Sequence, residues 1–416
     1  MFVYFYDVLL CIGNSVDLIS PEVTSHHQQV AFLSYQIGKK LGLDDIACRN
    51  LITAGLLHDI GALNSQERLM LIEEEAVTAD SHAFRSARLL EEAAPFADIT
   101  DTVRFHHVKW AGGQGRRYMG KNVPIGSHIL YLADRTCVKF DRNKNAIEQV
   151  PGVFEKITAD AGRLFMPEAV DALIQLKKND HIWLELMENS PLDYLPVQRI
   201  FGTYSLDINE MLEVTRMLSF IIDFRSHFTA THSAGVAYTA RHLGEIFGFS
   251  ETECKMMLIA GYLHDLGKLS VPNELLEKPS ALNDEEFKII RGHTFHTYRL
   301  LSTIKGFETI NKWAAYHHEK LNGKGYPFQL SEDHIPLGSR IMAVADVFTS
   351  ITEDRPYRKG MSELQIVNVL KSMAENGSLC GIVVEKLISR LSEFIRICQE
   401  SQAAVASLYE NLFNIA

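Results

Sequence analysis

The sequence reads Tyr262-Leu263-His264-Asp265-Leu266-Gly267 in its second half, and its first half reads Leu56-Leu57-His58-Asp59-Ile60-Gly61. A histidine precedes each His-Asp pair by the same interval, since His26 lies 32 residues before His58 and His232 lies 32 residues before His264. Repetition of a pattern at matched spacing indicates duplicated structural units. These stretches therefore predict that the chain contains two divergent copies of one domain.

The match between the halves extends to a further histidine, a His-His pair and an aspartate. In the first half these are His82, His106-His107 and Asp134, and in the second half they are His293, His317-His318 and Asp346. A hydrophobic core needs apolar volume rather than imidazoles that must each find a polar partner. We therefore attribute the repeated histidines to chemistry rather than to packing.

The spacing of apolar residues predicts the fold class. Apolar residues recur at helical intervals, for example at Val236, Leu243 and Ile246, whereas runs of strictly alternating residues are scarce. Ser190-Pro191, Pro196 and Gly202 interrupt the helical pattern between the two copies. The sequence thus predicts an all-α fold with two tandem helical domains, residues 1–195 and residues 196–416.

The composition limits the classes of partner. The chain has 416 residues and a formal net charge of −11 at pH 7, which argues against a protein that coats long nucleic acid. A small anionic substrate bound through metal ions remains compatible with this charge. The six cysteines form no CxxC pair, so we expect a reducing compartment and a cytoplasmic protein. The apolar start, Met1 to Ile19, is interrupted by Asp7, Asn14 and Asp17, so we expect no membrane segment.

Imidazole nitrogen and carboxylate oxygen together suit divalent Mn, Fe or Zn, and a carboxylate can bridge two such ions. The predicted metal ligands of the second half are His232, His264, Asp265, His293, His317, His318 and Asp346. Two metal ions about 3.5–4 Å apart activate a water molecule and hold a phosphate for in-line attack. The cluster therefore predicts hydrolysis of a phosphate ester without a covalent intermediate.

Residues 225 to 375 resemble the HD-GYP family, a branch of the HD superfamily of metal-dependent phosphohydrolases. The resemblance rests on His264-Asp265-Leu266-Gly267-Lys268, Val271-Pro272, Lys278-Pro279, His317-His318-Glu319, Gly323-Lys324-Gly325-Tyr326-Pro327, Arg340-Ile341 with Asp346, and Arg355-Pro356-Tyr357-Arg358. It implies that the second half is an HD-GYP domain that opens a 3′–5′ linked cyclic dinucleotide, 3′,3′-cyclic GMP-AMP or cyclic di-GMP, to a linear dinucleotide. The order of the two halves is similar to that of bacterial phosphodiesterases specific for cyclic GMP-AMP, which favours this substrate slightly.

The resemblance also implies roles for individual residues. Asp265 and Lys268 are the expected catalytic residues, and Lys268 is expected to contact a phosphate oxygen. The expected substrate-binding residues are Lys268, Asn322, Gly325, Tyr326, Pro327 and Arg358. Two divalent ions are expected, with Fe or Mn favoured and Zn, Ni or Mg also open.

The second half departs from the family pattern at several positions. Phe228 occupies the position at which some members carry a glutamate for a third metal ion, so we expect two ions. Asn322 replaces the usual aspartate before the Gly-Tyr-Pro loop, and Thr297 replaces a glycine after His293. Leu379-Cys380-Gly381 replaces the usual Phe-Asp-Pro. These changes bear on substrate preference and loop shape rather than on the metal ligands.

The first half resembles the wider HD superfamily but lacks the Gly-Tyr-Pro signature. Its candidate metal ligands are Glu22, His26, His58, Asp59, His82, His106, His107 and Asp134. Ala62 stands where the second half has Lys268, and residues 112–118 form a different, more basic loop. We therefore expect a degenerate HD-type domain with a structural or regulatory role.

Two other functions remain open from the sequence alone. One is a catalytically weak HD signalling or binding module that acts through partners. The other is an HD phosphohydrolase that acts on nucleotides or phosphomonoesters. A homodimer is likewise left open.

Overall fold

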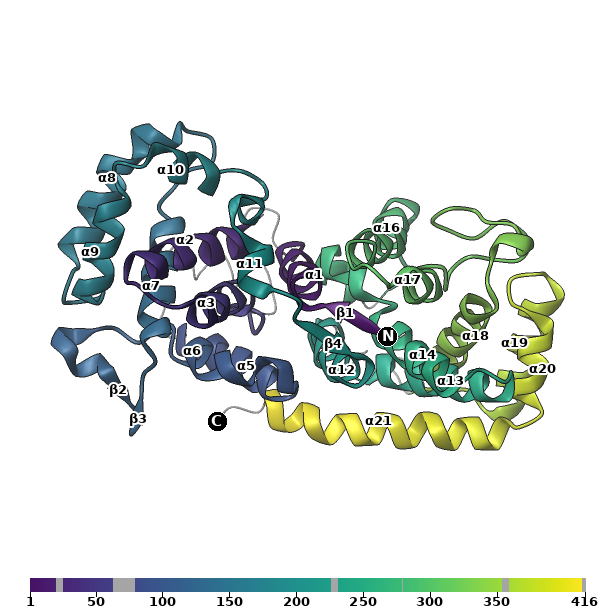
Figure 1. The fold of residues 1–416 in the computed structure, drawn as a ribbon. Helices are drawn as coiled ribbons and strands as arrows, with labels where there is room; N and C mark the ends of the chain where they lie inside the picture. Colours follow the sequence, from purple (N-terminus) through teal and green to yellow (C-terminus); the bar gives the residue numbers. More distant parts are fainter. Residues whose placement is uncertain (20–24, 63–78, 226–230, 279, 354–358, 414–416) are drawn as a thin grey trace. The chain divides into compact units, whose positions relative to one another are not determined.

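The computed structural model describes residues 1–19, 25–62, 79–225, 231–278, 280–353 and 359–413. Seven residues named above lie outside this range: Glu22, Phe228, Pro279, Arg355, Pro356, Tyr357 and Arg358. The described chain is mostly helical, with four short strands, which confirms the all-α prediction (Figure 1). Strand β1 (Phe2–Tyr4) pairs with β4 (Ser205–Asp207), and β2 (Arg117–Tyr118) pairs with β3 (Lys121–Asn122).

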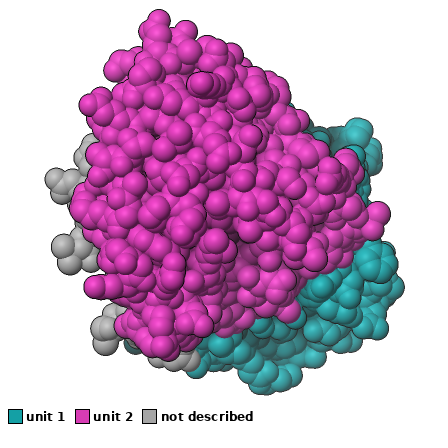
Figure 2. All heavy atoms as spheres, turned by 60° about the vertical axis from the view of Figure 1, so that its left-hand side comes forward, with its two compact units in different colours: residues 1–3, 206–416 teal, residues 4–205 magenta. Residues whose placement is uncertain are grey.

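The chain divides into two compact units, which Figure 2 colours separately. Unit 1, drawn in teal, contains residues 1–3 and 206–416, and unit 2, drawn in magenta, contains residues 4–205. In the described residues, no helix is long and apolar enough to cross a membrane.

Unit 2 begins with two helices that pack on a third. Its helices are α1 (Phe5–Asp17), α2 (His26–Lys40), α3 (Asp45–Leu57), α5 (Ala79–Glu91), η2 (Ala94–Ile99), α6 (Thr100–Arg104), η3 (Ala111–Arg116), α7 (Ile125–Cys137), α8 (Ala146–Ala159), α9 (Pro167–Leu176), α10 (Asp180–Leu186), η4 (Pro191–Tyr194) and α11 (Val197–Phe201). The side chain of Asp44 accepts a hydrogen bond from the Ala47 amide and starts α3. Gly55 of α3 meets the backbone of Ala31 in α2, where a Cβ would lie 2.5 Å from the Ala31 Cα. Only glycine permits this close crossing of α2 and α3.

Unit 1 repeats this construction. Its helices are α12 (Ile208–Phe224), α13 (His232–Ile246), α14 (Glu251–Leu263), η5 (Leu266–Ser270), α15 (Asn273–Leu276), α16 (Asp284–Leu301), α17 (Glu308–Ala315), η6 (Glu332–His334), α18 (Leu337–Thr352), α19 (Glu363–Glu375), α20 (Gly381–Ile388) and α21 (Leu391–Phe413). Ser250 and Glu253 form a capping box that starts α14. Gly261 of α14 meets Ala237 of α13 as closely as Gly55 meets Ala31, since its Cβ would lie 2.4 Å from the Ala237 Cα.

The long helix α21 and helix α18 also pack on α13 (Figure 1). Helix α13 is therefore central in unit 1, and its side chains are buried along most of its length. Its first residue, His232, is 3% exposed. In unit 2, α2 is equally central, since it packs on α3, α7 and α9, and its first residue, His26, is 7% exposed. Both units thus bury the start of a central helix, and in both that position is a histidine.

Candidate metal centres

The His-Asp pair of unit 1 lies at the end of α14, where the chain turns into η5. Gly267 makes this turn against α16, because a Cβ at Gly267 would lie 1.9 Å from the carbonyl oxygen of His293. Its amide donates a hydrogen bond to the Thr297 hydroxyl at 2.9 Å, and that hydroxyl donates to the His264 carbonyl at 3.1 Å. Glycine and threonine at these two positions therefore hold the His-Asp pair against the helix that carries His293.

The histidines of unit 1 are oriented by the backbone. The Nδ1 atoms of His264, His293 and His317 lie 2.6–2.7 Å from the carbonyl oxygen three residues earlier in each case. Because a carbonyl can only accept, each Nδ1 carries the proton, and each Nε2 offers a lone pair to the interior. This is the arrangement that fixes a histidine as a metal ligand.

Asp265 lies between two groups of histidines. Its Oδ1 is 3.3 Å from His293 Nε2 and 4.0 Å from His317 Nε2, and its Oδ2 is 3.1 Å from His264 Nε2. The two carboxylate oxygens thus face different imidazoles. A carboxylate in this position is suited to bridging two ions.

The remaining predicted ligands complete the cluster. His232 Nε2 lies 3.3 Å from one oxygen of Asp346, and His318 Nδ1 lies 3.9 Å from the other. Three overlapping groups can each hold a metal ion: His293-His317-His318, His264-Asp265-His317 and His232-His264-Asp346. The structure therefore brings all seven predicted residues together. The side chain of His318 is 31% exposed, whereas the other six are at most 11% exposed, so the cluster opens on the His318 side.

Lys268 lies beside this cluster, with its Nζ 2.6 Å from Asp265 Oδ2 and its side chain 26% exposed. Burial raises the pKa of Asp265, but His264 and Lys268 outweigh that effect and hold this pKa well below its usual range. Burial lowers the pKa of His232, but Glu353 and Asp346 outweigh it and raise this pKa to about 10. The carboxylates therefore create a buried negative site that favours a cation.

Glu353 is a functional candidate that the sequence analysis missed. One of its carboxylate oxygens lies 3.3 Å from His232 Nδ1, on the side of the ring away from Asp346. A carboxylate behind a ligating histidine orients the ring and increases its basicity. Glu353 directly follows α18, seven residues after Asp346, and no motif of the sequence singled it out.

Glu319 shapes the segment that follows the Gly-Tyr-Pro motif. It is 3% exposed, and its two carboxylate oxygens accept hydrogen bonds from the amides of Phe328 at 2.7 Å and Leu330 at 2.9 Å. The loop lies close to the backbone, because a Cβ at Gly325 would be 2.4 Å from the Lys320 nitrogen. Both features fix the path of the loop.

Tyr326 lies in the Gly-Tyr-Pro loop, next to His318 on the exposed side of the cluster. Its ring centroid is 4.9 Å from that of His318, and the guanidinium of Arg291 lies over it at 4.8 Å. Pro327 follows through a cis peptide bond. The predicted substrate-binding residues Gly325, Tyr326 and Pro327 thus lie next to the most accessible predicted ligand.

Asn322 lies in the same loop with its amide engaged by the backbone. Its Nδ2 donates to the Asn376 carbonyl at 2.9 Å, and its Oδ1 accepts from the Lys324 amide at 3.0 Å. In this conformation Asn322 joins the Gly-Tyr-Pro loop to the end of α19.

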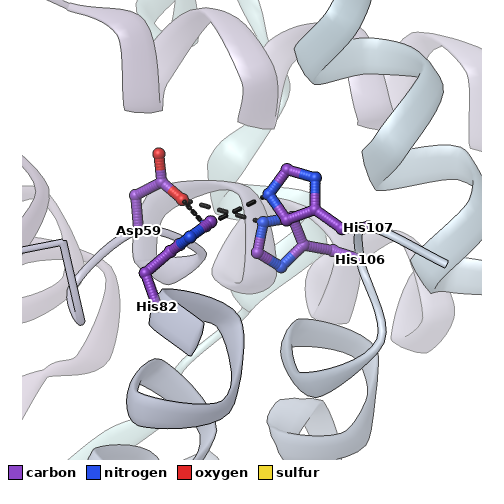
Figure 3. Close-up of side chains that lie close together, drawn as sticks. All are labelled: Asp59, His82, His106 and His107. Carbon is purple, nitrogen blue, oxygen red and sulfur yellow. Dashed lines mark hydrogen bonds and ion pairs between the residues drawn. The ribbon is translucent and has the colours of Figure 1, made fainter. Parts of the chain in front are cut away.

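Unit 2 assembles its described candidate ligands in the same order along the chain. Figure 3 shows Asp59, His82, His106 and His107 converging from the end of α3, from α5 and from the turn after α6. Asp59 Oδ1 is 3.1 Å from His82 Nε2 and 3.7 Å from His106 Nε2, and His107 Nε2 is 3.1 Å from His82 Nε2. A second group, His26-His58-Asp59, shares the aspartate. The amide of Gly61 donates to the Ser86 hydroxyl at 2.9 Å, as Gly267 does to Thr297.

The chain matches one protein family in both halves. The HD domain family matches residues 12–137 and 216–379, which include the His-Asp pairs of both units.

Curated relatives extend over much of the chain. The 3′3′-cGAMP-specific phosphodiesterase 1 of Vibrio cholerae serotype O1 is 27% identical over 398 residues, covering 93% of this chain and 92% of that protein. The 3′3′-cGAMP-specific phosphodiesterase 3 of the same organism is 30% identical over 297 residues, covering 67% of this chain and 62% of that protein. The cyclic di-GMP phosphodiesterase of Thermotoga maritima is 35% identical over 163 residues, covering 39% of this chain and 44% of that protein.

A solved structure shares the fold. The crystal structure of a cyclic GMP-AMP specific phosphodiesterase of V. cholerae, V-cGAP3, superposes with a TM-score of 0.64 and covers 98% of this chain and 99% of that chain, at 20% sequence identity. This likeness supports the tandem HD-type helical fold.

Proposed function

The chain belongs to the HD domain family, and from this premise we propose that it is a metal-dependent phosphodiesterase that opens a 3′–5′ linked cyclic dinucleotide to a linear dinucleotide. In this proposal the second half, residues 196–416, performs the hydrolysis. The first half, residues 1–195, has a structural or regulatory role.

One observation carries the proposal. Seven imidazole and carboxylate side chains meet around Asp265, and a lysine ammonium lies 2.6 Å from the same carboxylate, next to the accessible His318. Nitrogen and oxygen donors in this mixture fit Mn, Fe or Zn ions. We propose two ions, with Fe or Mn favoured and Zn, Ni or Mg also compatible, held by His232, His264, Asp265, His293, His317, His318 and Asp346.

In this proposal, different residues of unit 1 have different roles in hydrolysis. When bound, a pair of divalent ions supplies an activated water and neutralises charge on the phosphate. Asp265 is placed to hold both ions, and Lys268 is placed to donate a hydrogen bond to a phosphate oxygen as negative charge develops there. Tyr326 and the neighbouring Gly325 and Pro327 border the route by which a cyclic substrate reaches His318. Asn322 and Arg358 complete the proposed substrate contacts.

The extent of similarity favours one substrate. The relative named for 3′,3′-cyclic GMP-AMP matches 93% of this chain, whereas the T. maritima relative named for cyclic di-GMP matches 39%. We therefore propose 3′,3′-cyclic GMP-AMP as the preferred substrate and cyclic di-GMP as the second. The described residues and the comparisons give no support for the homodimer that the sequence left open.

Activity and metal content of the Asp265→Ala protein test this function. The wild-type chain, loaded with Mn²⁺ or with reduced Fe, should hydrolyse one or both cyclic dinucleotides, and the ratio of kcat/KM values defines the preference. Asp265→Ala should abolish hydrolysis and lower the metal content, while far-UV circular dichroism stays unchanged. Asp333→Ala, an exposed aspartate of unit 1, is the matched control and should behave as wild type.

Binding without turnover by the wild-type protein would favour the signalling or binding module instead. Turnover by a folded Asp265→Ala protein at the wild-type rate would refute the mechanism.

A further inference from the structure

Unit 2 contains a buried group of four donors whose spacing fits one metal ion. Asp59 Oδ1 lies 3.1 Å from His82 Nε2 and 3.7 Å from His106 Nε2, and His107 Nε2 lies 3.1 Å from His82 Nε2. One ligand atom from each of the four residues lies within 4.8 Å of the others. Four ligands at tetrahedral corners around an ion, with bonds of about 2.0–2.2 Å, stand roughly 3.4 Å apart. The donor atoms of unit 2 therefore surround a space of the size that such an ion requires.

One histidine of this group, His106, is oriented by the backbone for metal binding. His106 Nδ1 donates to the Val103 carbonyl at 2.6 Å, so its Nε2 presents a lone pair to the cluster. That Nε2 lies 3.7 Å from Asp59 Oδ1, beyond hydrogen-bond distance. His82 and His106 are fully buried, and burying imidazoles together is unfavourable unless a cation or hydrogen bonds satisfy them.

The neighbouring position in unit 2 differs from its counterpart in unit 1. Arg135, which stands where unit 1 has Val347, donates two hydrogen bonds to Asp134 Oδ2, from Nε at 3.0 Å and from Nη2 at 2.8 Å. In unit 1 the corresponding Asp346 belongs to the convergent group with His232 and His264. In unit 2 that group contains Asp59 instead of Asp134, although Asp134 Oδ1 still lies 3.2 Å from His26 Nε2. The guanidinium thus already supplies a positive charge at Asp134.

The two clusters also differ in the charged side chains around them. Among the described residues in contact with the clusters, unit 1 has the carboxylates of Asp265, Asp346 and Glu353 and the ammonium of Lys268, whereas unit 2 has Asp59 and Asp134 and the guanidinium of Arg135. Asp141 stands at the position of Glu353, but it forms a surface ion pair with Lys144. The described residues of unit 2 therefore place one carboxylate fewer beside the cluster than those of unit 1.

We propose that unit 2 binds a single divalent transition-metal ion through Asp59, His82, His106 and His107, and that the guanidinium of Arg135 takes the place of a second ion. Four protein ligands saturate a tetrahedral ion, which is typical of structural sites, whereas catalytic sites keep an open position. Ala62, at the position of Lys268, is fully buried and supplies no charge for a phosphate. The ion of unit 2 is thus structural, and this assignment does not depend on hydrolysis in unit 1.

Metal analysis of the full chain tests the stoichiometry. In the variant His264→Ala/Asp265→Ala/His317→Ala, each convergent group of unit 1 loses at least one member. After loading with Mn²⁺ and gel filtration, this variant should retain about one ion per chain. Its electron paramagnetic resonance spectrum should be that of an isolated Mn²⁺ ion rather than of an exchange-coupled pair. Retention of no ion, or of a coupled pair, would overturn the proposal.

Two variants in the same background test the ligands. His107→Gln should remove the remaining ion, whereas His128→Gln, which changes another buried histidine of unit 2, should leave it bound. In the otherwise wild-type chain, His107→Gln should lower the metal content by about one ion per chain, so the comparison does not require the background variant to fold. An unchanged metal content in that chain contradicts the assigned site.

Replacing the guanidinium tests the second part of the proposal. Arg135→Val introduces the residue that unit 1 carries at this position and should raise the Mn²⁺ content of the background variant to about two ions per chain, with a coupled spectrum. A content that stays at one ion shows that Arg135 is not what limits unit 2 to a single ion.

Discussion

The side chain of Lys268 lies between Asp265 and the solvent in unit 1. Its ammonium contacts Asp265, yet it is a quarter exposed, so one side of it remains available to an incoming phosphate. The family resemblance implied the role of Lys268, and its position three residues after the His-Asp pair agrees with it, because this separation places two side chains on one face of a helical turn. The structure shows that turn as η5.

Lys268→Ala should reduce kcat by roughly 10²–10³-fold, the range seen when a single transition-state donor is removed. The metal content should stay at the wild-type level, because Lys268 donates a hydrogen bond and is not a ligand. Steady-state kinetics together with elemental analysis of the same preparation measure both effects. Loss of metal would mean that Lys268 acts by holding Asp265 in place.

Glu353→Gln should weaken metal binding by roughly 10–100-fold, the range typical of the partner behind a ligating histidine. The amide preserves the shape of the side chain but loses the charge that orients His232 and increases its basicity as a ligand. Competition with a metal chelator measures the change, and Glu332→Gln, an exposed carboxylate of unit 1, is the control. Equal retention of metal by the two variants would remove Glu353 from the site.

The contribution of Glu353 illustrates what the sequence could not supply. The repeated histidines predicted a set of candidate ligands, which the structure brings together, because metal binding constrains residue type and spacing together. The contact between Glu353 and His232 joins residues 121 positions apart, and it depends on how α13 and α18 cross. The repeat does not contain it either, since Asp141 lies on the surface of unit 2. The hydrogen bond of the Asn322 amide could not be predicted from the sequence either. Its partner, the Asn376 carbonyl, lies 54 residues further along the chain, after the end of α19.

At the scale of elements, the His-Asp turn is held by a contact between η5 and α16. Gly267 leaves no room for a side chain against the His293 backbone, and the Thr297 hydroxyl bonds both Gly267 and His264. The sequence analysis treated Thr297 as a departure that bears on substrate preference and loop shape. The structure instead gives it a positioning role, and Ser86 has the same role in unit 2.

Gly267→Ala should destabilise unit 1 by about 1–3 kcal/mol and lower its metal content, because the added methyl group would force η5 away from α16. Gly292→Ala is the matched control, and it lies in α16, the helix that packs on η5. Its Cβ would meet only the His296 ring, at 3.9 Å, so this variant should be as stable as wild type or more stable by about 0.5–1 kcal/mol. Chemical denaturation of both variants measures the difference, and equal stabilities would show that the η5–α16 contact can relax.

At the scale of the whole molecule, two units with matching ligand positions are expected to do different work. Unit 1 combines its cluster with Lys268 and the Gly-Tyr-Pro loop, whereas unit 2 has Ala62 and Arg135 at the positions that matter for phosphate and for a second ion. The near-identical helix crossings at Gly55 and Gly261 show that the scaffold is shared. The units therefore share the helices that carry the ligands and differ in the side chains beside the cluster and in the loop after the His-His pair.

Asp59→Ala should leave most of the hydrolytic activity in place, whereas Asp265→Ala should remove it. The Asp59 variant should nevertheless unfold at a lower temperature, since an ion that binds only the folded state stabilises it. Activity and thermal unfolding of the two soluble full-length variants, measured side by side, separate these effects. Equal loss of turnover would imply two cooperating catalytic sites.

The pairing of Arg135 with Asp134 also has a nutritional consequence. A guanidinium is part of the polypeptide from synthesis onward, whereas a metal ion must be acquired from a supply that varies with growth conditions. If Arg135 replaces a second ion, as we propose, unit 2 needs one metal ion where unit 1 needs two. Under metal starvation, unit 1 would then be the part of the molecule that loses more of what it needs.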